Sequence, residues 1–168
     1  GKTWAGTIEY NSASAQTVVV GTYGNLTISN SGTKTLAGAS AVSSNGILAV
    51  SGGVFDPSTY LLTGSGTNTI TIASGATLRV GASTFAGSYS AGFGTVTPAS
   101  GSTIDYYLNG AQAIANGISY HHLVTSSGGV KTLAGNTTVA GDVTVGTSTT
   151  LDPTSGFTLT GSGTNVLN

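Results

Sequence analysis

Short stretches in which aliphatic residues alternate with Thr or Ser recur along the whole chain. They lie at 17–20, 25–29, 46–50, 68–72, 77–80, 102–106, 142–145 and 157–160. Because successive side chains of a strand point to opposite faces, this period of two predicts strands with one face in a core and one in solvent. Clusters of Gly, Asn and Ser between the stretches are typical of turns. The Ala-rich segment 110–116 is the one helix candidate, and it is too short to be stable alone.

The chain also contains an internal repeat with a period of about 97 residues. Residues 34–38 recur as 131–135, and residues 63–68 recur as 160–165. The order of the matches is kept, which indicates two copies, one over 1–100 and a second, truncated one over 101–168 that lacks a counterpart for about 72–100. We expect one continuous structure that is cut from, or polymerises into, a longer array.

A shorter recurrence indicates how each copy folds. Ile28, Val50 and Ile72 end successive predicted strands at intervals of 22 residues. An interval near 20 residues fits one coil of a parallel β-helix, a β-solenoid with two or three short strands per turn. The alternative all-β fold is two tandem β-sandwiches of about 97 residues each, because a sandwich domain has about 100 residues.

Charge and composition limit the classes of partner that the chain could bind. The chain has 4 basic and 5 acidic residues, a net charge of −1, 27 Gly and no Cys. So few basic residues give no electrostatic surface for nucleic acid, and no apolar run is long enough to span a membrane. The absence of Cys excludes a disulfide framework and thiolate chemistry. Since hydrophobic residues make up 38% of the chain, we expect a folded protein rather than a disordered one.

The repeat pattern resembles tandem repeats of large secreted bacterial surface proteins, the filamentous-haemagglutinin-like and autotransporter-passenger-like adhesins. The resemblance is carried by residues 6–11, Gln16, 25–29, 34–38 and their partners in the second copy. It implies a right-handed parallel β-helix, a stalk, fibre or adhesin role, an extracellular or cell-surface location and no catalytic residue. The second copy departs from the pattern at 107–108 and at 121–122, so we expect these positions to be locally specialised.

The few ionisable residues do not form a pattern typical of an enzyme. Asp56 and Asp152 are repeat-equivalent, and each precedes Pro, which favours turn initiation. His121 and His122 are adjacent, and adjacent strand residues point to opposite faces, so they are not expected to bind one metal. We find no phosphate-binding loop, nucleophile elbow or dinucleotide fingerprint. We therefore expect no enzymatic activity, no metal and no cofactor.

Aromatic residues are the remaining candidates for a binding site. They are Trp4, Tyr10, Tyr23, Tyr106, Tyr107 and Tyr120. Because Tyr10 and Tyr23 have repeat equivalents in Tyr106 and Tyr120, packing between coils is the favoured interpretation. Exposed aromatic rings that bind carbohydrate are the alternative.

Two functional hypotheses follow. The first is a structural repeat unit of an extracellular fibre, stalk or adhesin, because the open strand edges of a solenoid favour end-to-end self-association. The second is a binding module for carbohydrate or ice. Thr pairs at 33/35, 67/69, 95/97 and 147/149 are suggestive of an ice-binding face, but they do not recur at one strict interval.

Overall fold

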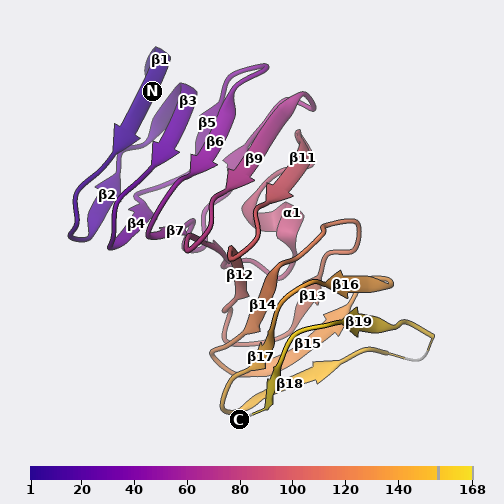
Figure 1. The fold of residues 1–168 in the computed structure, drawn as a ribbon. Helices are drawn as coiled ribbons and strands as arrows, with labels where there is room; N and C mark the ends of the chain where they lie inside the picture. The colour runs from indigo at the N-terminus through magenta and orange to yellow at the C-terminus, as the bar shows by residue number, and fades with distance from the viewer. Residues whose placement is uncertain (155, 168) are drawn as a thin grey trace.

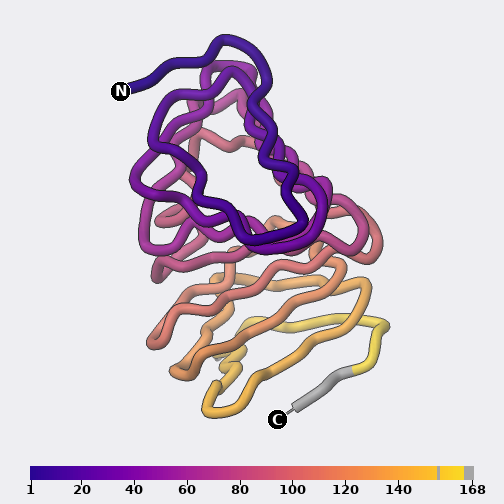
Figure 2. Tube along the Cα trace, turned by 90° about the vertical axis from the view of Figure 1, so that its left-hand side faces the viewer, coloured from indigo at the N-terminus to yellow at the C-terminus, as the bar shows by residue number. Residues whose placement is uncertain are grey.

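The chain folds into a β-solenoid, as its sequence predicts. The computed structural model describes residues 1–154 and 156–167. About 8 coils of ~20 residues are stacked (Figure 1), and the first coils surround a roughly triangular interior when viewed along the stack (Figure 2). Strand pairing is parallel in every sheet. This excludes the alternative of two β-sandwiches, which are built from antiparallel sheets.

The strands form four sheets. The 7-stranded sheet contains β1 (Lys2–Tyr10), β3 (Gly21–Ile28), β5 (Ser40–Val42), β6 (Ile47–Val50), β8 (Leu62–Thr63), β9 (Asn68–Ile72) and β11 (Phe93–Pro98). The 8-stranded sheet contains β2 (Gln16–Val18), β4 (Thr33–Leu36), β7 (Val54–Asp56), β10 (Thr77–Val80), β12 (Thr103–Tyr106), β14 (His122–Thr125), β17 (Val143–Val145) and β20 (Asn165–Leu167). The smaller sheets pair β13 (Gln112–Ile114), β15 (Gly129–Leu133) and β18 (Thr149–Asp152), and β16 (Thr137–Val139) with β19 (Leu159–Gly161).

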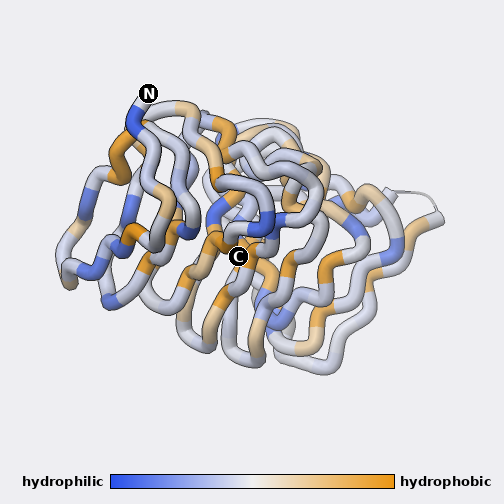
Figure 3. Tube along the Cα trace, turned by 90° about the horizontal axis from the view of Figure 1, so that it is seen from above, coloured by the Kyte–Doolittle hydropathy of each residue, from blue (hydrophilic) through white to orange (hydrophobic). Residues whose placement is uncertain are grey.

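The alternating pattern places its aliphatic residues inside the coils. Ile28, Val50 and Ile72 are in register on β3, β6 and β9, and at most 1% of each is exposed. Their neighbours Thr27 and Thr71 lie on the outer face of the same strands. Hydrophobic segments accordingly recur from coil to coil (Figure 3). Burying such a side chain contributes about 1.5–3 kcal/mol, so these columns provide much of the stability.

The second copy of the repeat is rotated by one face of the solenoid relative to the first. Strand β12 is the repeat equivalent of β1, which lies in the 7-stranded sheet, yet β12 lies in the 8-stranded sheet beside β10. Likewise β13 is the equivalent of β2 but begins a sheet of its own. The segment 72–100, which has no counterpart, adds β10, α1 and β11. This extra chain is not a whole number of coils, so the second copy begins one face further round.

The single described helix is a one-turn element at the junction of the copies. Helix α1 (Phe85–Ser88) begins after Thr84, whose side chain accepts a hydrogen bond from the Gly87 amide at 3.0 Å. This is an N-cap, which Thr often provides. The Ala-rich segment 110–116, judged too short for a stable helix, forms strand β13 at its centre. Within the described residues, no helix has the length and apolar character needed to cross a membrane.

Candidate functional site

Two tyrosines bind the backbone at one corner of the first coils. The Val19 amide donates a hydrogen bond to Tyr10 Oη at 2.9 Å, and the Tyr23 hydroxyl donates to the Val19 carbonyl. Tyr23 is fully buried, and its ring stacks on Trp4 with centroids 4.9 Å apart. The pair thereby fixes the corner at Val19. The Tyr23 ring lies in the core and is not exposed to a ligand.

The second copy repeats this corner with Tyr106 and Tyr120. The Ala115 amide donates to Tyr106 Oη at 3.0 Å, Tyr120 donates to the Ala115 carbonyl at 2.8 Å, and the two hydroxyl oxygens are 2.8 Å apart. Because the Tyr120 hydrogen points to Ala115, Tyr106 must donate to Tyr120. Burial raises the pKa of Tyr106 to about 12 and raises the pKa of Tyr120 further. Both tyrosines therefore stay neutral and act in packing and backbone hydrogen bonding.

A lysine and a glutamine bind an adjacent turn in the first copy. Lys34 is fully buried, and its Nζ donates to the Ser12 carbonyl at 2.6 Å and to the Ser31 carbonyl. Gln16, in register with Lys34, accepts from the Ser12 amide at 2.9 Å. Burial lowers the pKa of Lys34. Carbonyl partners make the buried ammonium tolerable, since a buried donor without partners is costly.

The second copy repeats this cluster too. Lys131 donates to the carbonyls of Leu108 and of Gly110, the latter at 3.0 Å, and Gln112 accepts from the Leu108 amide at 3.0 Å. Burial lowers the pKa of Lys131, while Asp105 opposes this shift. The repeated Lys-Thr-Leu-Ala-Gly sequence is thus explained by a structural role of its first residue.

The Asp-Pro sequences initiate turns, as predicted. Asp56 Oδ1 accepts from the Ser58 amide at 2.7 Å, and Asp152 Oδ1 accepts from the Thr154 amide at 2.8 Å. Ser58 and Thr154 have positive φ values of 55° and 59°. Each carboxylate therefore stabilises a backbone conformation that side-chain-bearing residues rarely adopt.

An ionic cluster joins the two copies at the outer face of the 8-stranded sheet. Arg79 on β10 lies between Asp56 on β7 and Asp105 on β12, with N–O distances of 3.4 and 3.5 Å. The Tyr107 hydroxyl donates to Asp56 at 2.5 Å, and the Arg79 guanidinium lies 5.0 Å from the Tyr107 ring centroid. Tyr107, a candidate ligand-binding aromatic, thus covers an ion pair. The sequence did not reveal this cluster, because its members are far apart along the chain and Arg79 lies in the segment without a counterpart.

Burial and the neighbouring groups of this cluster shift the pKa of Asp105 in opposite directions. Burial raises the pKa of Asp105, while a hydrogen bond from Ser126 at 2.7 Å and the charge of Arg79 lower it. Both carboxylates face the same guanidinium, so the cluster is organised to neutralise charge. The cluster is an ion pair across neighbouring coils.

The two histidines lie together, contrary to the expectation that they point apart. Their ring centroids are 4.4 Å apart at an interplanar angle of 74°, because His121 precedes the regular strand that His122 begins. His121 Nε2 lies 3.0 Å from the Ser100 hydroxyl, and His122 Nδ1 accepts from the Asp142 amide at 3.0 Å. The carboxylate of Asp142, from the next coil, lies 3.5 Å from the same nitrogen. In the described part of the chain, no group of three or more His, Cys, Asp or Glu residues is placed to hold a metal.

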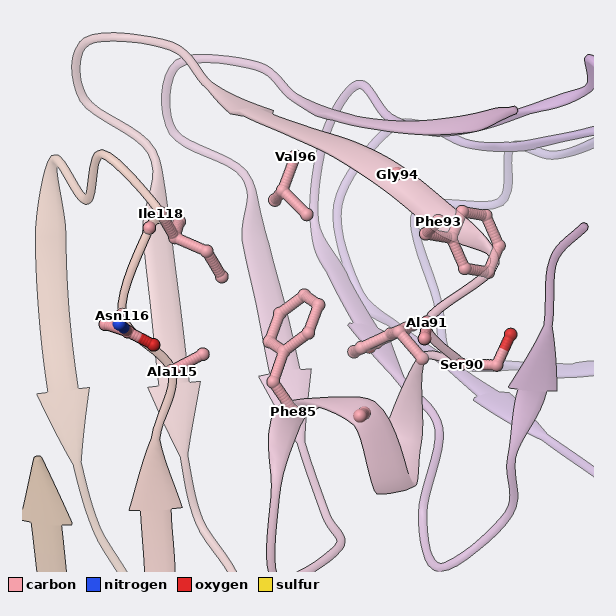
Figure 4. A pocket seen from close by; sticks show the side chains of 12 residues that line it. Phe85, Ser90, Ala91, Phe93, Gly94, Val96, Ala115, Asn116 and Ile118 are labelled. Atoms are coloured by element: carbon pink, nitrogen blue, oxygen red, sulfur yellow. The ribbon is translucent and has the colours of Figure 1, made fainter. Parts of the chain in front are cut away.

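An apolar pocket opens on the junction, where β11 faces the corner at 115–118 (Figure 4). It has a volume of about 220 Å³ and is lined by Phe85, Ala86, Tyr89, Ser90, Ala91, Phe93, Gly94, Val96, Ala115, Asn116, Gly117 and Ile118. Most of the lining belongs to the segment without a counterpart. Alternation alone did not indicate this pocket, because it depends on how the copies meet.

Comparison with known proteins identifies no relative. No family model, curated protein or solved structure matches the chain. The site must therefore be interpreted from its own geometry. That geometry offers repeated structural corners, an ionic cluster between coils and an apolar pocket at the junction of the copies.

Proposed function

We propose that the chain is a structural segment of an extracellular fibre, stalk or adhesin whose solenoids associate end to end. The observation that carries this proposal is the 8-stranded sheet, which runs through both copies from β2 to β20. Hydrogen bonds along the stack join every coil to the next on this face, as a rod that transmits tension requires. The ionic cluster of Asp56, Arg79 and Asp105 reinforces the face where the copies meet.

The contacts made by residues that recur in both copies also support a structural role. Residues that recur at an interval of 96 or 97, such as Tyr10, Lys34 and Asp56, contact backbone groups of the chain itself. Their side chains are used to fix corners and turns. A repeated catalytic or ligand-binding unit would instead present its recurring polar groups to a common cleft.

End-to-end association has a specific geometric test at the first coil. Strand β2 ends its sheet, and within the described residues its outer edge has no strand partner. The Ala37 amide donates to the Val18 carbonyl, so Val18 faces β4 and the backbone of Thr17 faces outward. Thr17→Pro removes an outward donor while it keeps the bonds to β4, and Thr17→Val is the matched control.

The proposed measurement is sedimentation velocity over a range of protein concentrations, with negative-stain electron microscopy of the same samples. We expect concentration-dependent rods for the wild type and for Thr17→Val, and markedly shorter particles for Thr17→Pro. Compact monomers of the wild type at every concentration would contradict end-to-end association.

The rows of Thr side chains on the outer face are too short to favour ice binding as a second function. Thr95 and Thr97 on β11 are in register with Thr69 and Thr71 on β9. On the preceding coil, β6, the equivalent positions are Ile47 and Ala49. The Thr pairs therefore extend over two neighbouring strands and are then interrupted by aliphatic side chains.

A further inference from the structure

We propose that the open side of the junction binds an extended, uncharged peptide segment, which adds as a strand to the free edge of β11 and places an aliphatic side chain in the apolar pocket. This binding site is independent of the fibre role. It arises where the 7-stranded sheet ends in the middle of the solenoid, because the second copy is rotated by one face.

The backbone of β11 has hydrogen-bonding groups available at this edge. Strand β11 pairs with β9 on one side, and no other strand of the described chain pairs with it. The Ala99 amide donates to the Ile72 carbonyl at 2.8 Å, so the alternation of a parallel ladder directs the backbone of Val96 away from β9, on the regular part of the strand after the register irregularity between Phe93 and Thr95. Pro98, at the end of the same alternation, has no amide hydrogen, as is usual for Pro on edge strands. The outward amide and carbonyl of Val96 and the outward carbonyl of Pro98 can therefore pair with an added strand.

The pocket beside this edge suits a side chain. The Phe85 ring and the side chains of Val96 and Ile118 point toward its interior (Figure 4). Its volume of about 220 Å³ is below the roughly 300–1,000 Å³ of pockets that enclose a whole small molecule. None of the lining residues carries a charge. We infer that one end of a larger, apolar partner enters the pocket, rather than a complete small ligand.

The chain itself shows which kind of strand β11 accepts. On its paired side β11 contacts β9, whose sequence Asn-Thr-Ile-Thr-Ile alternates hydroxyl and aliphatic residues, with Ile70 opposite Val96. An added strand of the same kind would place an aliphatic residue on the pocket side and Thr in solvent. On the other lip, the exposed Asn116 side chain makes no hydrogen bond within the described residues and lies at the rim, where it can bind a peptide carbonyl or amide.

The test uses a fluorescent, terminally capped peptide with the sequence of residues 68–73 and the whole protein. Fluorescence anisotropy should show saturable binding to the wild type. Ala91 is exposed and lines the pocket, so Ala91→Trp should fill the pocket without disturbing the fold and weaken binding by at least about tenfold. Ala140→Trp, at an exposed position outside the pocket, is the matched control and should bind as the wild type does.

A second probe tests the backbone pairing without altering the protein. The same peptide, N-methylated on alternate residues, loses the amide hydrogens of one edge, and we expect one of the two methylation phases to abolish binding. No binding of the unmodified peptide at millimolar concentration would overturn the proposal. Equal binding to Ala91→Trp, or equal binding of both methylated peptides, would also overturn it, because the peptide would then use another edge or no edge.

Discussion

The two sides of the junction between the repeat copies differ sharply. On one side β10 and β12 are paired in register, the Thr103 amide donates to the Ala76 carbonyl at 2.9 Å, and Arg79 joins the copies by ion pairs. On the other side the sheet ends at β11, and an apolar pocket separates it from the corner at 115–118. The difference shows that a solenoid can change its rotational register if one face keeps the hydrogen-bond ladder while another opens.

Amide hydrogen exchange should give the largest difference between the two sides. The Thr103 amide bridges β10 and β12, whereas the Val96 amide faces the open edge of β11. We expect the Val96 amide to exchange at least about 100-fold faster than the Thr103 amide, because it needs no opening of the ladder. Native-state exchange followed by NMR checks this. Equal protection of the two amides would show that the open side is closed in solution.

Replacement of Arg79 should break the continuous side. Arg79→Leu leaves Asp56 and Asp105, both largely buried, without their cation. We expect a loss of about 3 kcal/mol in the free energy of unfolding, at the low end for a broken buried pair because Arg79 is itself 35% exposed. Thr77→Leu, on the same face of β10, is the matched control and should change stability by less than about 0.5 kcal/mol. Urea unfolding measures both, and a loss below about 1 kcal/mol for Arg79→Leu would contradict the role of the cluster.

Alkaline pH should weaken the second-copy corner that forms one lip of the open side. Tyr106 has a pKa of about 12 in the folded chain, compared with 10.0 when exposed. Because burial raises the pKa of Tyr106 in the folded state, its neutral hydroxyl contributes its full stabilisation of the fold below pH 10. This contribution is lost as the pH rises towards 12. At pH 11 the loss is about 1.4 kcal/mol from Tyr106 alone. Thermal unfolding between pH 8 and 11 checks this, and a stability that stays constant to pH 11 would contradict the burial of the hydroxyl.

The smallest effect compares the two tyrosine corners directly. Tyr106→Phe leaves the partly buried Ala115 amide without its acceptor and should cost about 1 kcal/mol. Tyr10→Phe removes the equivalent bond to the more exposed Val19 amide, where water can replace the hydroxyl, and should cost about half as much. Chemical denaturation of both variants gives the comparison. A larger cost for Tyr10→Phe would show that the first-copy corner is the more strongly fixed of the two.

Much of the architecture could be predicted from local patterns. Alternation located eight of the strands, and the 22-residue interval correctly aligned Ile28, Val50 and Ile72 on successive coils. The Asp-Pro turns were also predictable, since their chemistry is local. These features depend on neighbouring residues or on one repeated distance, which a single sequence displays directly.

The junction could not be predicted in the same way. The contacts of Arg79 with Asp56 and Asp105 depend on coil lengths of more than 20 residues that vary along the chain. The adjacent rings of His121 and His122 result from an irregular residue before β14, where strand alternation does not apply. To predict the rotation of the second copy, one would need to know how far the unmatched segment 72–100 winds round the solenoid axis. Alignment of the two copies shows that this segment has no counterpart in the second copy, but it does not show the course of the segment around the solenoid.

The rotation of one copy against the other affects how a longer array of such units would present itself to its surroundings. Each additional full unit would turn its equivalent surface to a new direction, so that matching patches would follow a spiral around the rod. A partner approaching from any side would then meet the same chemistry at regular heights. Such a rod would present no extended flat face of equivalent residues to a flat, crystalline surface.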